Sequence, residues 1–405
     1  MTNSCSVVSD APSHIPATRV YDFDFYNDPL YAQKDSIHDV FMHLSQNAPG
    51  MFWTPRNGGH WVLIDQALIY KAFREPEVFS SDRQAIPPMP VEVPLPPITT
   101  DPPNHSKFRA PLNKAFSPKA MMALSGEVRT LAAELIDKVA GSGKCDFVSA
   151  VAEPLPVLIF MKLMGMPLDR LEEFREWVHD SLANTPAREV AYGKVAELMS
   201  GLIDARLEKP EDDLISRLVE LEIDGENLSR ESLLGYCQLL FIAGLDTVVN
   251  AMSFAIRHMS RNPELQDLLR AEPERIPDAV EEMLRRYSIA MPNRRVAIDT
   301  TWNGVEVRAE DRVLMCLPAA NFDAKAFPDP GEYKLDRENN VHITFGAGIH
   351  RCAGSHLARI ELQILYDEWL KRIPAFRPDP NQRERFHGAN VLSMDYLPII
   401  WDVKA

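Results

Sequence analysis

Cysteine is scarce in this chain, and its distribution excludes a small fold held together by disulfides. The 405 residues contain five cysteines, namely Cys5, Cys145, Cys237, Cys316 and Cys352. Such an odd and scattered set supplies no disulfide framework and predicts a reducing compartment such as the cytoplasm. Met1 to Pro16 has neither the basic start nor the apolar core of a signal peptide, so we expect no cleaved leader.

Positive charge is also in deficit. Lysine and arginine number 43 against 58 aspartate and glutamate residues, which gives a formal net charge of −15 and a sequence pI near 5.2. This balance argues against nucleic acid as the main partner and favours a soluble protein. A G-x-G-x-x-G loop after a strand is missing as well, since the glycines at 346, 348 and 354 have the wrong spacing. We therefore expect no nucleotide-binding domain.

Long hydrophobic runs are rare, and one run could be mistaken for a membrane span. Leu239 to Ile256 is almost entirely apolar, but it contains Asp246, Thr247 and Asn250. An aspartate at the centre of a lipid-facing helix costs ~3 kcal/mol on insertion scales. The run is therefore predicted to be a long central helix in the core of a soluble protein.

Helical periodicity predicts a mainly α fold with a minor β region. The predicted helices are residues 125–140, 168–184, 187–208, 212–222, 230–260, 263–271, 275–288 and 354–372. Strand signals are few and fall at residues 61–64, 295–302, 305–307, 313–315 and 399–401. We expect a flexible tail over residues 1–18 and a single domain over residues 19–405.

The Pro-rich segment at residues 86–103 has two interpretations. It contains eight prolines in eighteen residues, which is a composition typical of a linker. A domain boundary there would leave an N-terminal piece too short to bury a good core. We favour an ordered loop over a cleft, where proline lowers the entropy lost on ordering.

The run from Phe345 to Gly354 carries the strongest chemical signal. It reads F-G-A-G-I-H-R-C-A-G, and the apolar periodicity after Cys352 predicts a helix that begins close to the sulfur. A thiolate is the form that binds metals, and a helix N-terminus lowers the pKa of a nearby thiol. Gly348 and Gly354 would let the backbone pass close to a large flat ligand, and Phe345 could pack against its edge. The alternatives are a buried structural cysteine or a zinc site with His350 and His356.

The spacing F-x-x-G-x-x-x-C-x-G resembles the haem-binding loop of the cytochrome P450 family. The resemblance implies that Cys352 is the axial ligand of the iron in haem b (iron protoporphyrin IX). An anionic sulfur ligand favours cleavage of the O–O bond. The resemblance to the family also implies a triangular, mainly α domain, in which the haem lies between a long central helix and the Cys-ligand loop.

Asp246 and Thr247 lie in the apolar central helix, where a polar pair is costly. A threonine can bond to the carbonyl four residues earlier and bend a helix, and the small Ala243 and Gly244 would widen a groove there. A buried ion pair of Asp246 with a self-satisfied Thr247 is the structural alternative. The P450 resemblance implies an acid–alcohol pair that delivers protons during activation of O₂.

Two further sets of residues are identified through the same resemblance. The proposed partners of the haem propionates are His105, Arg109, Arg294 and His350, and the adjacent Arg295 leaves the register uncertain by one residue. The E-x-x-R motif of Glu282 and Arg285 is expected to form a buried network with Arg337 that supports folding and haem retention. Taken singly, most such residues are surface groups.

The substrate pocket is expected to differ from that of the camphor-hydroxylase branch, to which the chain is similar over nearly its whole length. Val93 replaces the tyrosine that anchors the camphor ketone, and the loss of this hydroxyl removes a hydrogen bond worth ~1 kcal/mol. Asn390 could supply another donor. We therefore expect a compact apolar bicyclic monoterpenoid such as 1,8-cineole in preference to camphor. The other expected wall residues are Ala85, Leu95, Leu239, Ile242, Ala243, Ala290, Pro292 and Val391.

Electrons are expected to come from a [2Fe-2S] ferredoxin and its NAD(P)H-dependent reductase, because no second cofactor domain is predicted. A basic patch on an acidic protein can steer an acidic partner, and surface solubility is the alternative explanation for such residues. The patch would consist of Lys107, Arg109, Lys114 and Arg351 on the cysteine side of the haem. The rival functions are a haem-thiolate peroxygenase or isomerase and a non-enzymatic haem or zinc protein.

Overall fold

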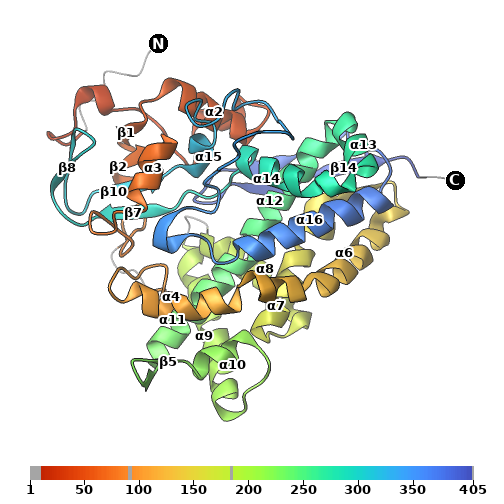
Figure 1. Ribbon diagram of the computed structural model, residues 1–405, viewed down its shortest axis with the longest axis horizontal. Helices are drawn as coiled ribbons and strands as arrows, with labels where there is room; N and C mark the ends of the chain where they lie inside the picture. Colours follow the sequence, from red (N-terminus) through yellow and green to blue (C-terminus); the bar gives the residue numbers. More distant parts are fainter. Residues whose placement is uncertain (1–10, 90–93, 183–185, 404–405) are drawn as a thin grey trace. The chain divides into compact units, whose positions relative to one another are not determined.

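The computed structural model describes residues 11–89, 94–182 and 186–403. About 51% of the chain is helical and only a small share is sheet, which confirms the predicted mainly α class. The chain forms two compact units, and neither is a continuous stretch (Figure 1). The first contains residues 1–106, 284–352 and 387–392, and the second contains residues 107–283, 353–386 and 393–405. Because both flanks of the Pro-rich segment belong to the first unit, no unit boundary falls there.

The first unit is built on a five-stranded sheet in the order β1-β2-β10-β7-β3. Strand β10 pairs with β2 in parallel, and the other neighbours are antiparallel. The strands are β1 (Met51–Thr54), β2 (His60–Leu63), β10 (Arg312–Met315), β7 (Asn293–Val296) and β3 (Phe79–Ser80). Every residue of these five strands is buried, including the polar Asn293, Arg294 and Arg295 of β7.

Short helices and one hairpin complete the first unit. Its core packs Trp61, Leu63, Val313 and Met315 from the sheet against side chains of the surrounding segments. Ile15 also lies in this core, although the sequence analysis assigned it to an N-terminal tail. The other elements are α2 (Ile37–Asn47), α3 (Gln66–Ala72), α15 (Leu317–Ala320) and the hairpin of β8 (Thr300–Trp302) and β9 (Val305–Val307).

The second unit consists mainly of helices, and the pairing of α6 with α16 is its most extensive helix contact. On α16, Trp369 is fully buried among the rings of Phe147, Phe376 and Trp401. The helices are α5 (Pro118–Ala123), α6 (Ser125–Ala140), α7 (Pro154–Met164), α8 (Leu171–Leu182), α9 (Ala187–Glu208), α10 (Leu214–Val219), α11 (Arg230–Leu245), α12 (Thr247–Ser260), α13 (Pro263–Ala271) and α16 (Ser355–Arg372). A three-stranded sheet, β11-β14-β4, joins Phe376–Pro378, Pro398–Trp401 and Lys144–Asp146.

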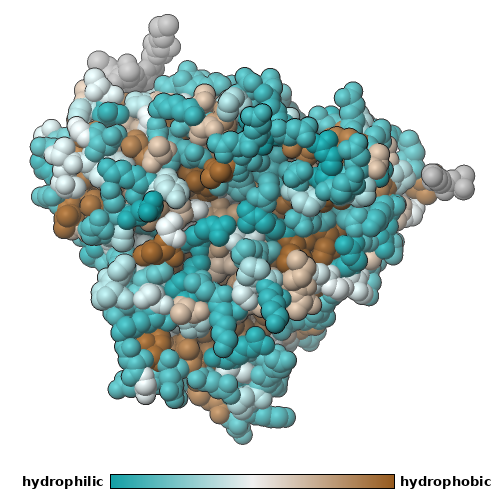
Figure 2. Space-filling model, in the orientation of Figure 1, coloured by the Kyte–Doolittle hydropathy of each residue, from teal (hydrophilic) through white to brown (hydrophobic). Residues whose placement is uncertain are grey.

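Several short elements lie outside these groups. Helices α4 (His105–Ala115) and α14 (Ile276–Arg286) each cross from one unit to the other along the chain. Two small strand pairs are β5 (Glu222–Ile223) with β6 (Glu226–Asn227) and β12 (Arg385–His387) with β13 (Ser393–Tyr396). Figure 2 shows a face that is mostly hydrophilic, with apolar side chains scattered over it, as is usual for protein surfaces.

The predicted central helix over residues 230–260 is broken at one residue. Helix α11 ends at Leu245 and α12 begins at Thr247, while Asp246 between them has φ −122° and ψ −42°. By length and hydropathy alone this pair passes the test for a membrane span, but 56% of its most apolar window is buried inside the protein. The break places a polar residue where two apolar helices meet.

Gly244 has a packing role that the sequence analysis did not anticipate. A Cβ at this position would lie 2.5 Å from the Phe160 ring of α7. The glycine therefore permits close contact between α11 and α7, and the predicted widening of a groove by Gly244 is wrong. Ala243, by contrast, is exposed.

We expect Gly244→Ala to destabilise the protein and Gly201→Ala to stabilise it. The first change overpacks the contact with Phe160 and should cost ~1–3 kcal/mol. Gly201 lies in the middle of α9 with no atom within 4 Å of a Cβ, so alanine should add ~0.5–1 kcal/mol through its helix propensity. Urea unfolding of both variants tests this, and equal midpoints would contradict the packing argument.

Candidate functional site

The Cys352 loop is shaped by two glycines in left-handed conformations. Gly346 and Gly348 both have φ of +68°, which L side chains adopt only at a cost. The turn closes through a hydrogen bond from the Cys352 N–H to the Phe345 carbonyl, with N···O 2.9 Å. Helix α16 begins three residues after the cysteine, at Ser355. The predicted helix following the thiol is therefore present.

The thiol of Cys352 differs from the other described thiols in its exposure. Cys352 is exposed, whereas Cys237 and Cys316 are buried and Cys145 is half-buried. Burial raises the pKa of each of these three other thiols to about 12. They are therefore held as neutral thiols at neutral pH, and neutral thiols are poor metal ligands. Cys352 is the described cysteine that a large ligand can reach.

Phe73, at the end of α3, fixes the path of the loop. A Cβ on Gly348 would lie 2.3 Å from the Phe73 carbonyl oxygen. The glycine is thus required both by its φ and by the close approach of a second backbone segment. The Phe73 ring also lies 5.2 Å beneath the Arg294 guanidinium. Sequence reasoning missed Phe73, because nothing in its local sequence marks a contact with residues far along the chain.

Asn321 anchors the start of the same loop. Its Oδ1 accepts a hydrogen bond from the Ile343 N–H at 3.1 Å, and its Nδ2 donates to Thr344 Oγ1 at 2.8 Å. Thr344 Oγ1 in turn donates to the Leu284 carbonyl at 2.7 Å. Asn321 is fully buried, and its side-chain bonds hold the loop against the end of α14. It too was missed by the sequence analysis.

The E-x-x-R motif lies in the interior. Glu282 and Arg285 on α14 are both completely buried. The Arg285 guanidinium donates to the carbonyls of Asn321 and Glu332, at 2.9 and 3.2 Å. Arg337 donates to the same Glu332 carbonyl at 2.9 Å. The structure thus brings Arg285 and Arg337 together and joins them to the residue that anchors the cysteine loop.

His105 and His350 lie in contact, with ring centroids 4.4 Å apart. His105 is buried at the first position of α4, where its N–H donates to the Asp101 carbonyl at 3.1 Å. His350 ends a short 3₁₀ turn two residues before Cys352. Two of the residues assigned to the propionates, far apart in sequence, therefore converge beside the cysteine loop.

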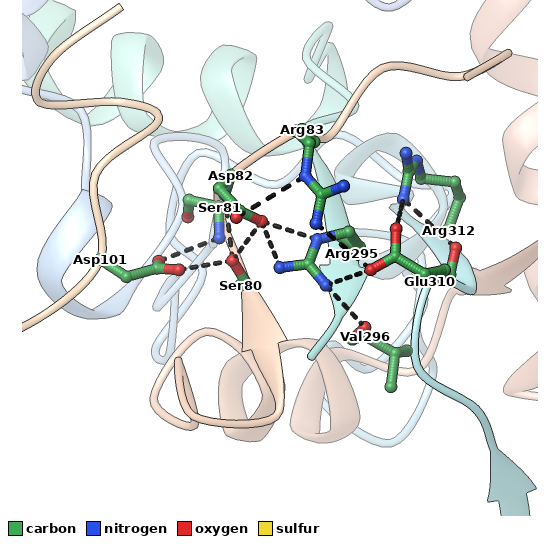
Figure 3. Close-up of polar contacts among 9 residues, drawn as sticks. All are labelled: Ser80, Ser81, Asp82, Arg83, Asp101, Arg295, Val296, Glu310 and Arg312. Carbon is green, nitrogen blue, oxygen red and sulfur yellow. Dashed lines mark hydrogen bonds and ion pairs between the residues drawn. The ribbon is translucent and has the colours of Figure 1, made fainter. Parts of the chain in front are cut away.

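Arg294 and Arg295 follow each other in β7 and have contrasting environments. The Arg295 guanidinium lies between two carboxylates, Asp82 at 2.6 Å and Glu310 at 2.8 Å (Figure 3). Arg294 forms no ion pair with any residue that the structure describes. Its guanidinium donates to the Asn293 carbonyl and the Gln84 side chain, and burial lowers its pKa to about 10.

The contacts of Figure 3 also join Asp101, four residues before His105, to Ser80 and Ser81 at the end of β3. Asp101 accepts hydrogen bonds from the Ser81 N–H, at 3.0 Å, and from the Ser80 hydroxyl. Asp101 is close enough to Arg294 for its charge to raise the pKa of the guanidinium partway back. The Asp101 carboxylate therefore bonds to Ser80 and Ser81, and Arg294 has no direct anionic partner in the part of the chain that the structure describes.

The acid–alcohol pair lies at the break between α11 and α12. Thr247 Oγ1 donates to the Ala243 carbonyl at 3.4 Å, which is the predicted bond four residues back. The Asp246 carboxylate accepts a hydrogen bond from Asn250 Nδ2 at 3.1 Å. Both residues are half-buried. This geometry leaves an acid and a hydroxyl next to each other where the helical path is interrupted.

All the expected wall residues that the structure describes are at least partly exposed. None of the described ones is fully buried: Ala85, Leu95, Leu239, Ile242, Ala290, Pro292, Asn390 and Val391 are half-buried and Ala243 is exposed. Val93 lies outside the described residues. On α11, Leu239, Ile242 and Ala243 form one open apolar face directly before Asp246, while Leu240 and Phe241 are buried. Asn390 accepts a long hydrogen bond at Oδ1 from Asn293 Nδ2, at 3.4 Å.

The residues expected to form a basic patch have mixed surroundings. Lys107 forms an ion pair with Asp224, and Arg109 Nε donates to Asn113 at 2.8 Å on the same helix. Lys114 and Arg351 are exposed. Among residues 11–89, 94–182 and 186–403, no group of three histidine, cysteine, aspartate or glutamate side chains is arranged to hold a metal ion. This gives the zinc interpretation no support.

Comparison with known proteins identifies the family. The family model for cytochrome P450 matches residues 187–392. A probable cytochrome P450 127A1 of Sinorhizobium fredii is 33% identical over 96% of both chains, and a steroid C26-monooxygenase of Mycolicibacterium smegmatis is 30% identical over 95% of this chain and 97% of that protein. The crystal structure of CYP101J2 is 32% identical, with a TM-score of 0.89, and covers 97% of this chain and 99% of its own.

This chain therefore belongs to the cytochrome P450 family of monooxygenases. The cofactor of the family is haem, iron protoporphyrin IX. Residues of the first unit fit this group, because the exposed Cys352 thiol could supply a sulfur ligand, and the buried Arg294 cation, which has no ion pair among the described residues, could be the partner of a carboxylate. A buried charge without a counter-ion is costly, which favours an anionic ligand at Arg294.

We expect Gly348→Ala to cost more stability than Gly304→Ala and to impair haem binding. Both glycines have φ near +70°, so alanine carries a strain of ~1–2 kcal/mol at either position. Only Gly348 would also collide with a backbone atom, whereas Gly304 has no atom within 4 Å of a Cβ. Thermal unfolding and haem content measure the difference. Similar losses in the two variants would show that φ strain alone operates.

Proposed function

We propose that this chain hydroxylates an unactivated C–H bond of a small apolar cyclic terpenoid, with 1,8-cineole favoured over camphor. The observation that carries the proposal is the open apolar face of Leu239, Ile242 and Ala243 directly before Asp246. Apolar pockets with a few polar groups are typical ligand sites. Among the described wall residues, only Asn390 has a polar side chain. A wall with one possible donor suits a compact substrate with one weak acceptor, such as an ether oxygen.

The residues would divide the work as follows. Cys352 binds the iron of the haem, which when bound supplies the activation of O₂ and the transfer of one oxygen atom to the substrate. Arg294, His105, His350 and Arg109 hold the propionates. Asp246 and Thr247 accept and donate protons at the carboxylate and the hydroxyl, and positioned groups of this kind accelerate proton transfer.

Arg294 rather than Arg295 is proposed to meet a propionate. Arg295 already has two carboxylate partners, and a third anion there would be repelled. Arg294 is buried as a cation, and it remains protonated at neutral pH despite its lowered pKa. A propionate would neutralise its charge, and hydrogen bonds between two charged groups are stronger than those between neutral ones.

We also propose a cytoplasmic protein that receives electrons from a ferredoxin through Lys107, Arg109, Lys114 and Arg351. The contrast between this basic group and a chain of net charge −15 supports electrostatic steering of an acidic partner. The pairing of Lys107 with Asp224 makes Lys107 the weakest member of the group. The buried thiols of Cys237 and Cys316 and the half-buried thiol of Cys145 are all free, which suits a reducing compartment.

The substitutions Arg294→Met and Arg295→Met separate the two arginines. Methionine at 294 removes a buried charge that has no ion pair among the described residues, so the urea midpoint of the haem-free protein should hold or rise, while haem transfer to an acceptor globin should become about ten-fold faster. Methionine at 295 removes the nearest cation of both Asp82 and Glu310, whose ion pairs with Arg83 are longer, so it should lower the midpoint with little effect on haem transfer. The opposite pattern would assign the propionate to Arg295.

The substrate proposal is tested by titrating the purified haem protein with terpenoids and following the spin-state shift of the iron. We expect 1,8-cineole to bind more tightly than camphor or a steroid. Asn390→Leu should weaken cineole binding by about five-fold, as the loss of one hydrogen bond of ~1 kcal/mol implies, and should leave binding of the hydrocarbon bicyclo[2.2.2]octane unaffected. Tighter binding of camphor would refute the pocket argument. Turnover with peroxide but not with O₂ would indicate a peroxygenase.

A further inference from the structure

Asn250 links the catalytic acid to a neighbouring strand of the second unit. It lies one helical turn after Asp246 on α12 and is only 2% exposed. Its Nδ2 donates to Asp246 Oδ2 and to the Asp246 carbonyl, both at 3.1 Å. Its Oδ1 accepts a hydrogen bond from the Met394 N–H on β13 at 2.9 Å. Both the nitrogen and the oxygen of the Asn250 side-chain amide therefore form hydrogen bonds.

The bonds of Asn250 are concentrated where the helix is interrupted. The Asp246 carbonyl receives the backbone N–H of Asn250 at a long 3.3 Å as well as its side-chain amide. The side chain thus supports a carbonyl whose ordinary helical bond is stretched. A second donor hydrogen on the same nitrogen reaches the Asp246 carboxylate, so the backbone and the side chain of the acid are held by one group.

The bond from Met394 fixes the amide in turn. Because the Met394 N–H can only donate, it requires an acceptor, and the oxygen of Asn250 must point to β13. The nitrogen is then directed to Asp246, and this assignment of oxygen and nitrogen follows from the bonding pattern. A buried amide with these partners has a single orientation, and it restricts the rotation of the carboxylate to which it donates.

We propose that Asn250 is a positioning residue that acts through Asp246, holding the carboxylate in the orientation that proton delivery requires. The inference rests on the role given to Asp246 under Proposed function. It extends that role to the strand β13, whose Met394 N–H sets the orientation of the Asn250 amide. Asn250 itself transfers no proton in this account.

Asn250→Asp and Asn250→Leu separate the two ends of the amide. Aspartate keeps an acceptor for the Met394 N–H but loses the amide donors, whereas leucine loses both. Amide hydrogen exchange of the haem-loaded protein should therefore show Met394 protected in the wild type and in Asn250→Asp, and exposed to exchange in Asn250→Leu. Exchange that is equal in all three proteins would overturn the proposed anchoring.

The functional readout is the fraction of consumed NADH that appears as hydroxylated product, with hydrogen peroxide measured alongside. We expect Asn250→Asp to lower this fraction about ten-fold with no change in the substrate affinity measured by the spin-state shift. In an Asp246→Asn background the same substitution should have no further effect, because residues that act as one unit are not additive.

Ser253→Ala is the matched control. Ser253 is also buried on α12, and its hydroxyl bonds to the Val249 carbonyl at 2.7 Å. Its loss should leave the product fraction unchanged. An unchanged fraction in Asn250→Asp, or effects of Asp246→Asn and Asn250→Asp that add, would overturn the role of Asn250 alone. An unchanged fraction in Asp246→Asn by itself would instead refute the function proposed for Asp246.

Discussion

The backbone turn that presents the Cys352 thiol is the constraint on which the site depends. Two glycines at φ +68° and the bond from Cys352 N–H to the Phe345 carbonyl set its path, and the carbonyl of Phe73 leaves no space for a side chain at Gly348. Buried polar bonds from Asn321 then fasten the start of the loop. Because each bond lies between segments distant in sequence, the thiol is positioned by the fold and not by its local helix alone.

The two adjacent arginines of the first unit differ in their charged partners, and this difference separates a structural role from a binding role. Arg295 is neutralised within the protein by Asp82 and Glu310, whereas the adjacent Arg294 is buried without an ion pair among the described residues. Alternation along a strand sends consecutive side chains to opposite faces, so two neighbouring arginines can have unlike roles. The buried cation is an energetic cost that an anionic ligand would remove.

Sequence patterns predicted the features that are local. The helices at 125–140, 187–208, 263–271 and 354–372 are confirmed almost to the residue, because capping and periodicity act over a few positions. The hairpin around Asn303-Gly304 is also present, but the strand predicted over 295–302 is wrong in its length, since the structure divides it between β7 and β8. The helix at Pro154–Met164 was missed because it is apolar on all sides, and β1 and β3 were missed because they are short and buried. The break at Asp246, the packing of Gly244 on Phe160 and the role of Asn321 depend on contacts with distant segments. No single-sequence pattern reports such contacts.

The most direct test of the central claim is the absorption spectrum of the reduced protein with carbon monoxide, recorded for the wild type and for Cys352→Ser. A thiolate bound to haem iron gives the long-wavelength band from which this family takes its name. The account predicts this band in the wild type and its absence in the serine variant, with Cys316→Ser unchanged as a control. A wild type without the band, or a serine variant that keeps it, would contradict the assignment of Cys352 as the iron ligand.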